Sequence, residues 1–136
     1  MNVEISTKSN RDGETVKYYY PNGKLEQEFI SIKGKRHGEC KVYDYDTGNI
    51  WIIENYKNGR YHGENKEYFK NGNIKHIHNY VNNEPEGQHI EYYENGICMS
   101  IRNFVNGCID GEQKYFDESG NLRHTSIFVN GVRKDC

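Results

Sequence analysis

The chain has 136 residues, a length that suits one domain. Only 34% of the residues are hydrophobic, alanine is absent, and no apolar stripe recurs every 3.6 residues, which excludes a helical bundle. Twelve tyrosines argue against disorder, and a net charge of −2 provides no overall electrostatic attraction to nucleic acid. The class that remains is an all-β repeat protein with little interior.

The glycines recur every 24 or 25 residues and divide the chain into five repeats. They form three series: Gly13, Gly38, Gly63, Gly87 and Gly111; Gly23, Gly48, Gly72, Gly96 and Gly120; and Gly34, Gly59, Gly107 and Gly131. Asn83 occupies the vacant place in the third series, and asparagine is well suited to a left-handed backbone. We therefore expect structural turns at the second series and a positive φ at Asn83. Self-similarity with this period is the signature of a repeat architecture.

A single repeat domain over residues 1–136 is expected. Residues 1–12 lack the repeat and are predicted to form a tail or a cap over the first strand. The repeats follow at approximately 13–36, 37–61, 62–85, 86–109 and 110–136. Each begins with an aromatic-rich strand that leads to a hairpin turn, where dipeptides such as Asn71-Gly72 predict type I′ geometry. A second strand and a linking turn complete the unit.

The second strand of each repeat carries apolar residues on both faces. Eight residues after the turn glycine stand Tyr56, Tyr80, Phe104 and Phe128, and we expect these rings to stack across successive repeats. Cys98 takes a slot filled elsewhere by leucine or isoleucine, so it is predicted to be a small buried hydrophobe. The expected fold is an elongated, twisted, single-layer antiparallel meander of about five β-hairpins.

The recurring pattern Y-Y/F-x-N-G-x-L/I, followed by an aromatic residue, N-G and then H-G-E or D-G-E, resembles the MORN-repeat variant family, which is common in bacterial antitoxin-like proteins. The resemblance covers about Asp12 to Lys134. It implies stacked β-hairpins that act as interaction scaffolds, with membrane or phosphoinositide association in related proteins, and it supplies no catalytic residue. Departures at Ser31, Asp44 and Glu84-Pro85-Glu86 are positions at which a specialised surface would lie.

No catalytic, cofactor or metal site is predicted. No serine sits in a strand-turn-helix elbow, and the carboxylates follow the repeat, which favours a structural role. His76 and His78 share a strand face and could meet Glu67 or His89 at a metal ion. Ordinary half-exposed strand histidines are the favoured interpretation. The sequence thus predicts a protein without enzymatic activity.

A protein partner is the predicted ligand. Candidate contact residues are Tyr19, Tyr68, Tyr92, Tyr93, Tyr115, Arg123, Thr125 and Ile127. Because an exposed edge is a template for another strand, Asn121–Val129 is expected to pair with a toxin-like partner or with a second copy. A tyrosine platform for single-stranded nucleic acid is disfavoured by the mixed charge. The alternative function is binding to a membrane surface through Lys33–Lys41. Met1–Asn10 lacks the apolar segment of a signal peptide, so a cytoplasmic location is expected.

Overall fold

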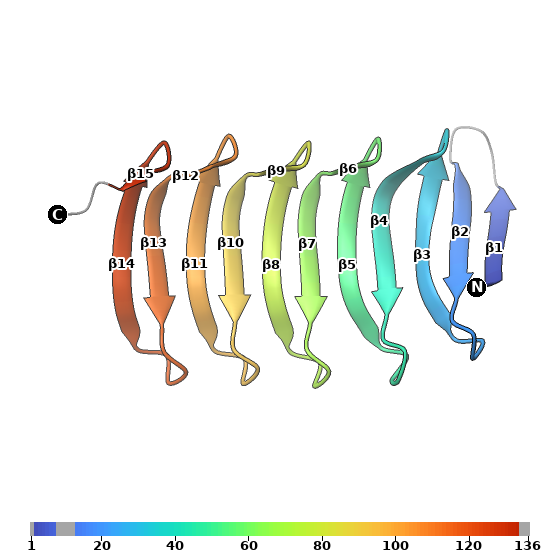
Figure 1. Ribbon diagram of the computed structural model, residues 1–136, viewed down its shortest axis with the longest axis horizontal. Helices are drawn as coiled ribbons and strands as arrows, with labels where there is room; N and C mark the ends of the chain where they lie inside the picture. Colours follow the sequence, from blue (N-terminus) through green and yellow to red (C-terminus); the bar gives the residue numbers. More distant parts are fainter. Residues whose placement is uncertain (1, 8–12, 134–136) are drawn as a thin grey trace.

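The computed structural model describes residues 2–7 and 13–133, and every secondary-structure element in these ranges is a β-strand (Figure 1). The long strands are β1 (Asn2–Thr7), β2 (Glu14–Tyr19), β3 (Leu25–Ile32), β4 (Lys35–Tyr43), β5 (Ile50–Lys57), β7 (Gly63–Tyr68), β8 (Ile74–Val81), β10 (Gly87–Tyr92), β11 (Cys98–Val105), β13 (Gly111–Phe116) and β14 (Leu122–Val129). The two-residue strands are β6 (Arg60–Tyr61), β9 (Glu84–Pro85), β12 (Cys108–Ile109) and β15 (Val132–Arg133).

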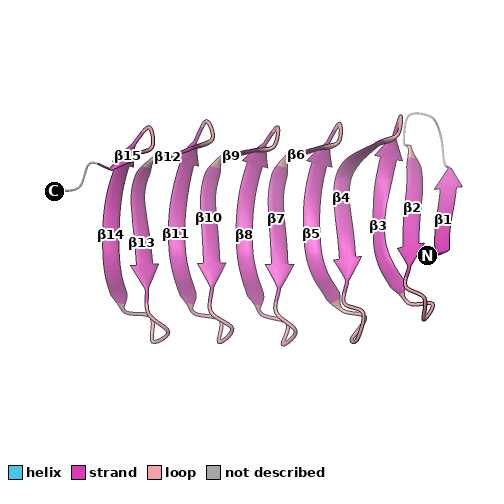
Figure 2. Ribbon diagram, viewed as in Figure 1, coloured by secondary structure: helices cyan, strands magenta, loops and turns pink. Residues whose placement is uncertain are grey.

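All the described strands belong to one antiparallel sheet. The order is β1-β2-β3-β4-β5-β7-β8-β10-β11-β13-β14-β15, and β6, β9 and β12 pair with β5, β8 and β11. The strands lie side by side in a single layer, with loops at both ends (Figure 2). The predicted elongated meander of hairpins is therefore confirmed. Its twist is gentle, because the axes of the strands, which alternate in direction, stay nearly parallel from β1 to β14 in this view (Figure 1).

The predicted cap at residues 1–12 lies partly outside the described residues. Its described part, β1, pairs with β2 from Asn2 opposite Tyr19 to Thr7 opposite Glu14. This pairing adds an edge strand to the sheet ahead of the first repeat.

The linking turns between hairpins have type I′ geometry. Both central residues have a positive φ in each turn, for example 51° at Asn58 and 78° at Gly59. Asn83 has a φ of 70°, as predicted, and its neighbour Asn82 has a φ of 48°. Asn83 also joins two repeats, because its N–H donates to the Tyr61 carbonyl at 2.9 Å and its Oδ1 accepts from the Tyr61 N–H at 2.7 Å.

The prediction of type I′ geometry for the hairpin turns at the second glycine series is wrong. In these turns only the glycine has a positive φ, which is 91° at Gly72, and the preceding Asn71 does not. The Gly72 N–H donates to the Phe69 carbonyl at 2.9 Å, and the Phe69 N–H donates to the Asn73 carbonyl at 2.8 Å. Three residues therefore connect the strands, in a type I turn whose left-handed glycine forms a β-bulge.

The hairpin turn of the second repeat is one residue longer than that of the third. Its closing bond runs from the Gly48 N–H to the Asp44 carbonyl at 2.9 Å, and the Asp44 N–H donates to the Asn49 carbonyl at 2.8 Å. Four residues thus connect the strands. This longer loop begins at Asp44, one of the departures from the aromatic pattern.

The buried side chains lie on one face of the sheet, which we name the packed face. They are Val16, Phe29, Cys40, Asn65, His89, Ser100, Gln113 and Ser126. Val16, Phe29 and Cys40 form an apolar cluster that Tyr18, Val42 and Tyr56 complete. Beyond the second repeat the buried residues are polar. Burial of a polar group is costly unless it is hydrogen-bonded, so these side chains need partners.

Three asparagines, seven residues after the hairpin glycine, provide those partners: Asn55, Asn79 and Asn103. The Asn103 N–H donates to Gln113 Oε1 at 2.7 Å, and Asn103 Nδ2 donates to the Glu112 carbonyl at 2.6 Å. Asn55 makes the same pair of bonds to Asn65 and Glu64. His89 Nε2 and the Asn79 carbonyl are 2.7 Å apart. Asn65, His89 and Gln113 therefore each bond to the backbone of the preceding repeat.

Candidate interaction surfaces

The predicted contact tyrosines do not form one surface. Tyr19, Tyr68 and Tyr92 hold equivalent positions at the ends of β2, β7 and β10. Tyr93 begins the next turn, and its hydroxyl donates to the Phe116 carbonyl at 2.8 Å, so it joins two repeats. Tyr115 lies opposite His124, and their ring centroids are 5.9 Å apart. These tyrosines are therefore spread over four of the five repeats.

The rings predicted to stack across successive repeats contact one another only through intervening side chains. Tyr56 contacts Tyr61 with ring centroids 5.1 Å apart, and Tyr61 contacts Tyr80 at 5.2 Å. His89 then lies between Tyr80 and Phe104, at 5.3 Å and 4.7 Å from their rings. The rings of successive repeats are therefore bridged by intervening side chains, because equivalent strands lie two strand spacings apart.

The outer edge of β14 carries the other predicted contact residues. β15 pairs with β14 only at Phe128 and Val129, so no strand pairs with the outer side of Thr125 or Ile127 in the described residues. Side-chain exposure is high here, at 45% for Ile127 and 52% for Leu122. This end of the sheet is both apolar and unpaired over most of its length.

Thr125 and Ile127 both direct their backbone N–H outward. Ile127 stands seven residues after its hairpin glycine, the slot held by Asn55 and Asn103, whose N–H groups bond across to the next strand. N–H groups alternate between the two sides of an antiparallel strand, so Thr125, two residues earlier, shares this direction. The sequence left open which of the two N–H groups faces outward, and the repeat geometry answers that both do.

Arg123, also predicted as a contact residue, is held within the hairpin. Its Nε and Nη2 atoms each lie 2.7 Å from Asp117 Oδ2. The same carboxylate accepts hydrogen bonds from the turn backbone, and these bonds lower the pKa of Asp117. Arg123 therefore stabilises the fifth turn.

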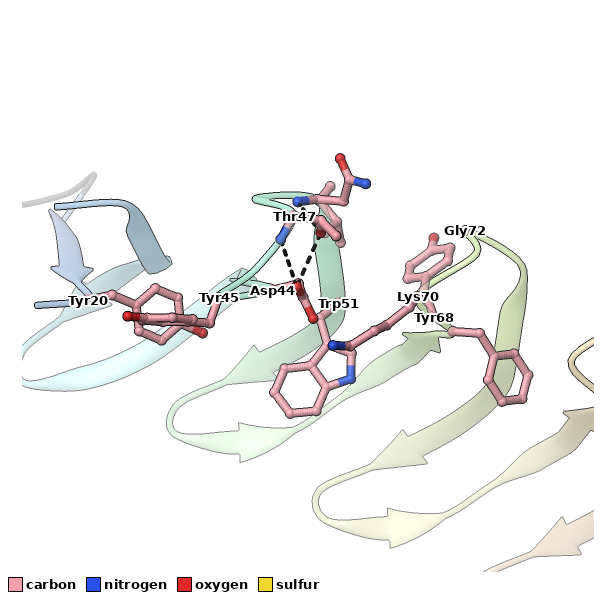
Figure 3. Close-up of a pocket in the computed structure, with 11 residues that line it drawn as sticks. Tyr20, Asp44, Tyr45, Thr47, Trp51, Tyr68, Lys70 and Gly72 are labelled. Atoms are coloured by element: carbon pink, nitrogen blue, oxygen red, sulfur yellow. Dashed lines mark hydrogen bonds between the residues drawn. The ribbon is translucent and has the colours of Figure 1, made fainter. Parts of the chain in front are cut away.

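A cleft of about 300 Å³ lies between the hairpin turns of the second and third repeats (Figure 3). Its lining includes Tyr45 from the second turn, Trp51 from β5 and Tyr68 from β7. Trp51 is 43% exposed and Tyr45 is 48% exposed. Lys70 reaches in from the third turn and pairs with Asp46 at 2.9 Å. Sequence reasoning noted Asp44 as a departure from the pattern but did not predict that it would lie with Trp51 at one cleft.

Three histidines stack on the packed face. His76 and His78 have ring centroids 4.1 Å apart, and His78 and His89 are 4.6 Å apart. Burial lowers the pKa of all three, to about 4 for His78. His78 Nε2 is buried without a hydrogen-bond partner, and Glu91 Oε1 is 3.8 Å away. Among the described residues no group of three potential ligands is arranged to hold a metal ion.

The cysteine interpretation needs correction. Cys98, expected to be buried, is only partly buried, whereas Cys40 is fully buried in the slot that Asn65, His89 and Gln113 hold in later repeats. Burial raises the pKa of the Cys40 thiol to about 11, which keeps it protonated. The signal was present in the sequence, because Cys40 follows Gly38 by two residues as the other three follow their glycines.

The basic segment Lys33–Lys41 is partly neutralised. Lys41 lies 3.5 Å from Glu39, and Arg36 is directed over the Phe29 ring at 4.1 Å. Two of its four cationic side chains therefore already interact with neighbouring residues of the sheet. No helix long and apolar enough to cross a membrane occurs in residues 2–7 and 13–133.

The repeat geometry agrees with the comparison to known families. The model for the MORN repeat variant matches residues 15–30, 36–58, 61–82, 85–106 and 109–130. The chain therefore belongs to the MORN repeat variant family. Repeats of this kind form non-enzymatic modules for protein or membrane interaction. No curated protein matches the chain.

Proposed function

We propose that this chain is a non-enzymatic, cytoplasmic protein-binding module that pairs the outer edge of β14 with an extended segment of a partner protein. The specific form of the proposal is antitoxin-like, with a toxic protein as the partner that the scaffold neutralises. The observation that supports it is the pair of outward N–H groups at Thr125 and Ile127, to which no described strand is paired.

The internal junctions indicate what the partner segment must supply. β10 meets the outer edge of β8 as an antiparallel strand at His76 and Ile77. The equivalent positions on β14 are His124 and Thr125, so an antiparallel segment there would continue the ladder of main-chain hydrogen bonds. Exposed Ile127 favours an apolar side chain opposite it, because cross-strand neighbours pack together.

The asparagine that binds the next repeat is missing at this edge. Ile127 replaces it, and the only other repeat with isoleucine in the slot is the first, at Ile30, where a register shift interrupts the pairing of β3 with β4. A regular junction between repeats uses the asparagine side chain to bond the incoming backbone. The β14 edge therefore suits an occupant that pairs through main-chain groups, which is a strand of another protein.

Proline substitutions at the edge test this function. Thr125→Pro and Ile127→Pro each remove one outward donor, and we expect binding of the co-purifying partner to weaken about fivefold, since one hydrogen bond contributes about 1 kcal/mol. The partner is first captured from native cells with the unaltered chain, purified, and then titrated against each variant by calorimetry. Thr125→Val is the matched control, because it keeps the N–H and should bind as the unaltered chain does.

Two outcomes would overturn the proposal. One is unchanged partner affinity in both proline variants, provided that circular dichroism confirms that their sheets are intact. The other is a dimer of this chain, detected by light scattering after size exclusion, that both proline variants abolish while no other protein is captured. That result would assign the edge to a second copy.

A further inference from the structure

We propose that the cleft between the hairpin turns of the second and third repeats binds a proline-rich segment in the polyproline II conformation. The proposal does not depend on the β14 edge, which lies at the far end of the sheet from this cleft (Figure 1).

The cleft exists because the second repeat lacks the aromatic residue that begins the turn in three of the other repeats. In the first and fourth repeats this residue is Tyr20 or Tyr93, and its hydroxyl donates to a backbone carbonyl of the next repeat at 2.7 or 2.8 Å. Phe69 holds the place in the third repeat, and Asp44 holds it in the second. A short carboxylate does not fill the place of that ring, so a space remains between the second and third turns, bridged by the Lys70–Asp46 ion pair.

Aromatic rings from two elements flank this space. Tyr45, in the four-residue turn, packs edge-on against Tyr20 with ring centroids 5.0 Å apart and an interplanar angle of 82°. Trp51 lies in the bulge that opens β5, on the other side of Asp44 (Figure 3). Both Tyr45 and Trp51 are more than two-fifths exposed. Spaced aromatic rings that line a groove are the surface on which polyproline II segments dock.

Several of the acceptors at the cleft are already engaged by the protein itself. Asp44 Oδ1 accepts from the backbone N–H groups of Asp46 and Thr47, each at 2.9 Å. Asp46 Oδ2 accepts from Lys70 Nζ at 2.9 Å. Lys24 Nζ donates to the Asp46 carbonyl at 3.1 Å. One oxygen of each carboxylate and one turn carbonyl are thus engaged within the protein.

Two hydrogen-bond donors at the cleft are unused. Neither the Trp51 Nε1–H nor the Tyr45 hydroxyl has a hydrogen-bond partner in residues 2–7 and 13–133, and an indole N–H can only donate. A fitting ligand therefore supplies carbonyl oxygens for these donors and apolar groups for the rings. Proline has no backbone N–H, and its polyproline II helix leaves its carbonyls unpaired.

Two other ligand classes fit less well. A cationic side chain would be repelled by the ammonium groups of Lys24 and Lys70, which already lie at the second turn. A sugar would bring hydroxyl donors, and two of the carboxylate oxygens that could accept from them, Asp44 Oδ1 and Asp46 Oδ2, are already engaged. The unused donors and the two ammonium groups therefore favour the proline-rich segment.

The test uses the fluorescence of Trp51, which is the only tryptophan in the chain. A capped decaproline peptide should cause a saturable change in emission, and a glycine-serine peptide of equal length should not. Tyr45→Ala should weaken the interaction about tenfold, since truncating an aromatic contact residue at an interface has effects of this size. Tyr115→Ala is the matched control, because Tyr115 is also an exposed tyrosine but lies in the fifth repeat.

Calorimetry with the same peptides detects binding that leaves the Trp51 emission unchanged. Absence of both heat and an emission change at millimolar decaproline would overturn the proposal. Equal binding of the glycine-serine peptide, or equal weakening by Tyr115→Ala, would do the same. A saturable response to cellohexaose without one to decaproline would assign the cleft to a sugar instead.

Discussion

The buried slot two residues after the first-series glycine shows how single residues replace a conventional core. Cys40 fills it with an apolar side chain, whereas Asn65, His89 and Gln113 fill it with polar ones. Gln113 is fully buried, yet its Oε1 accepts from the Asn103 N–H and its Nε2 donates to the Gly111 carbonyl at 3.0 Å. A polar side chain in this slot contributes to specificity of pairing, because only a correctly placed amide satisfies the neighbouring backbone.

The histidine stack predicts a pH-dependent stability. Burial, followed by repulsion from His76, His89 and Arg102, lowers the pKa of folded His78 to about 4. The unfolded chain, with an ordinary pKa of about 6.5, binds the proton first as pH falls, so stability is complete above pH 6.5 and declines toward pH 4. We expect urea titrations to register a loss of up to about 3 kcal/mol across that window.

The matched variant is His78→Phe, which keeps a ring between its neighbours and cannot be protonated. Its unfolding free energy should fall less steeply between pH 6.5 and pH 4 than that of the unaltered chain. Glu67 and Glu91 also face the stack and are the same in both proteins, so the difference between the two proteins isolates the contribution of His78. If the unfolding free energy of the two proteins falls equally between pH 6.5 and pH 4, protonation of His78 does not destabilise the fold.

At the level of elements, different side chains provide the same hydrogen bond in the hairpin turns. In the Asn-Gly hairpin turns the asparagine Oδ1 accepts from the N–H two residues later, as Asn71 does from Asn73 at 2.9 Å. The Thr47-Gly48 and Ser119-Gly120 turns lack that asparagine. In the fifth repeat Asp117 Oδ1 accepts from the equivalent Asn121 N–H at 2.9 Å, and in the second repeat Thr47 Oγ1 accepts from the Asn49 N–H at 3.1 Å. An aspartate begins the turn in both of these repeats, and its Oδ1 also accepts from N–H groups early in the turn, such as that of Ser119 at 3.0 Å.

Because an asparagine or an aspartate can provide this acceptor, an introduced asparagine should restore stability that is lost when Asp117 is removed. Asp117→Ala should lower the free energy of unfolding, because it removes the oxygen that accepts from two N–H groups of the turn and the carboxylate that pairs with Arg123. Adding Ser119→Asn should recover about half of that loss, since the introduced amide oxygen would restore the Asn-Gly arrangement of the other turns. Thermal and urea unfolding of the single and double variants measure both effects. A double variant no more stable than Asp117→Ala would contradict the proposed equivalence of the two turns.

The turns also mark the limit of what the sequence could predict. Glycine spacing alone placed every turn and the positive φ at Asn83, because few residues tolerate that backbone. It could not distinguish Asn58-Gly59, which is type I′, from Asn71-Gly72, which is not. The same dipeptide suits both, and the choice depends on the number of residues between the last paired positions of the strands. The cleft was missed for a similar reason, because it arises from an absent ring and one extra loop residue.

On the scale of the whole molecule, the sheet has an apolar cluster near its N-terminal end. Val16, Phe29 and Cys40 form it, and the later repeats are held by backbone ladders and buried amides between neighbours. Each repeat contacts the repeats beside it, as the strand order requires. Stability in such an array is a sum of local terms rather than the property of one centre. The period of the sequence predicted this architecture, but not the difference between the two ends.

The difference between the two ends of the sheet can be tested by deleting either the last or the first repeat. Removing residues 110–136 takes away β13, β14 and β15 and leaves the Asn103 amide facing water, where it stays solvated. We expect a folded four-repeat sheet with a lower urea midpoint and most of its β-sheet circular dichroism. Removing residues 1–36 instead takes away Val16 and Phe29 and uncovers Cys40, so apolar area is lost as well as strands. That protein should be far less stable, although a similar number of strands is missing. Complete loss of sheet signal after the first deletion would mean that the repeats fold only as one closed unit.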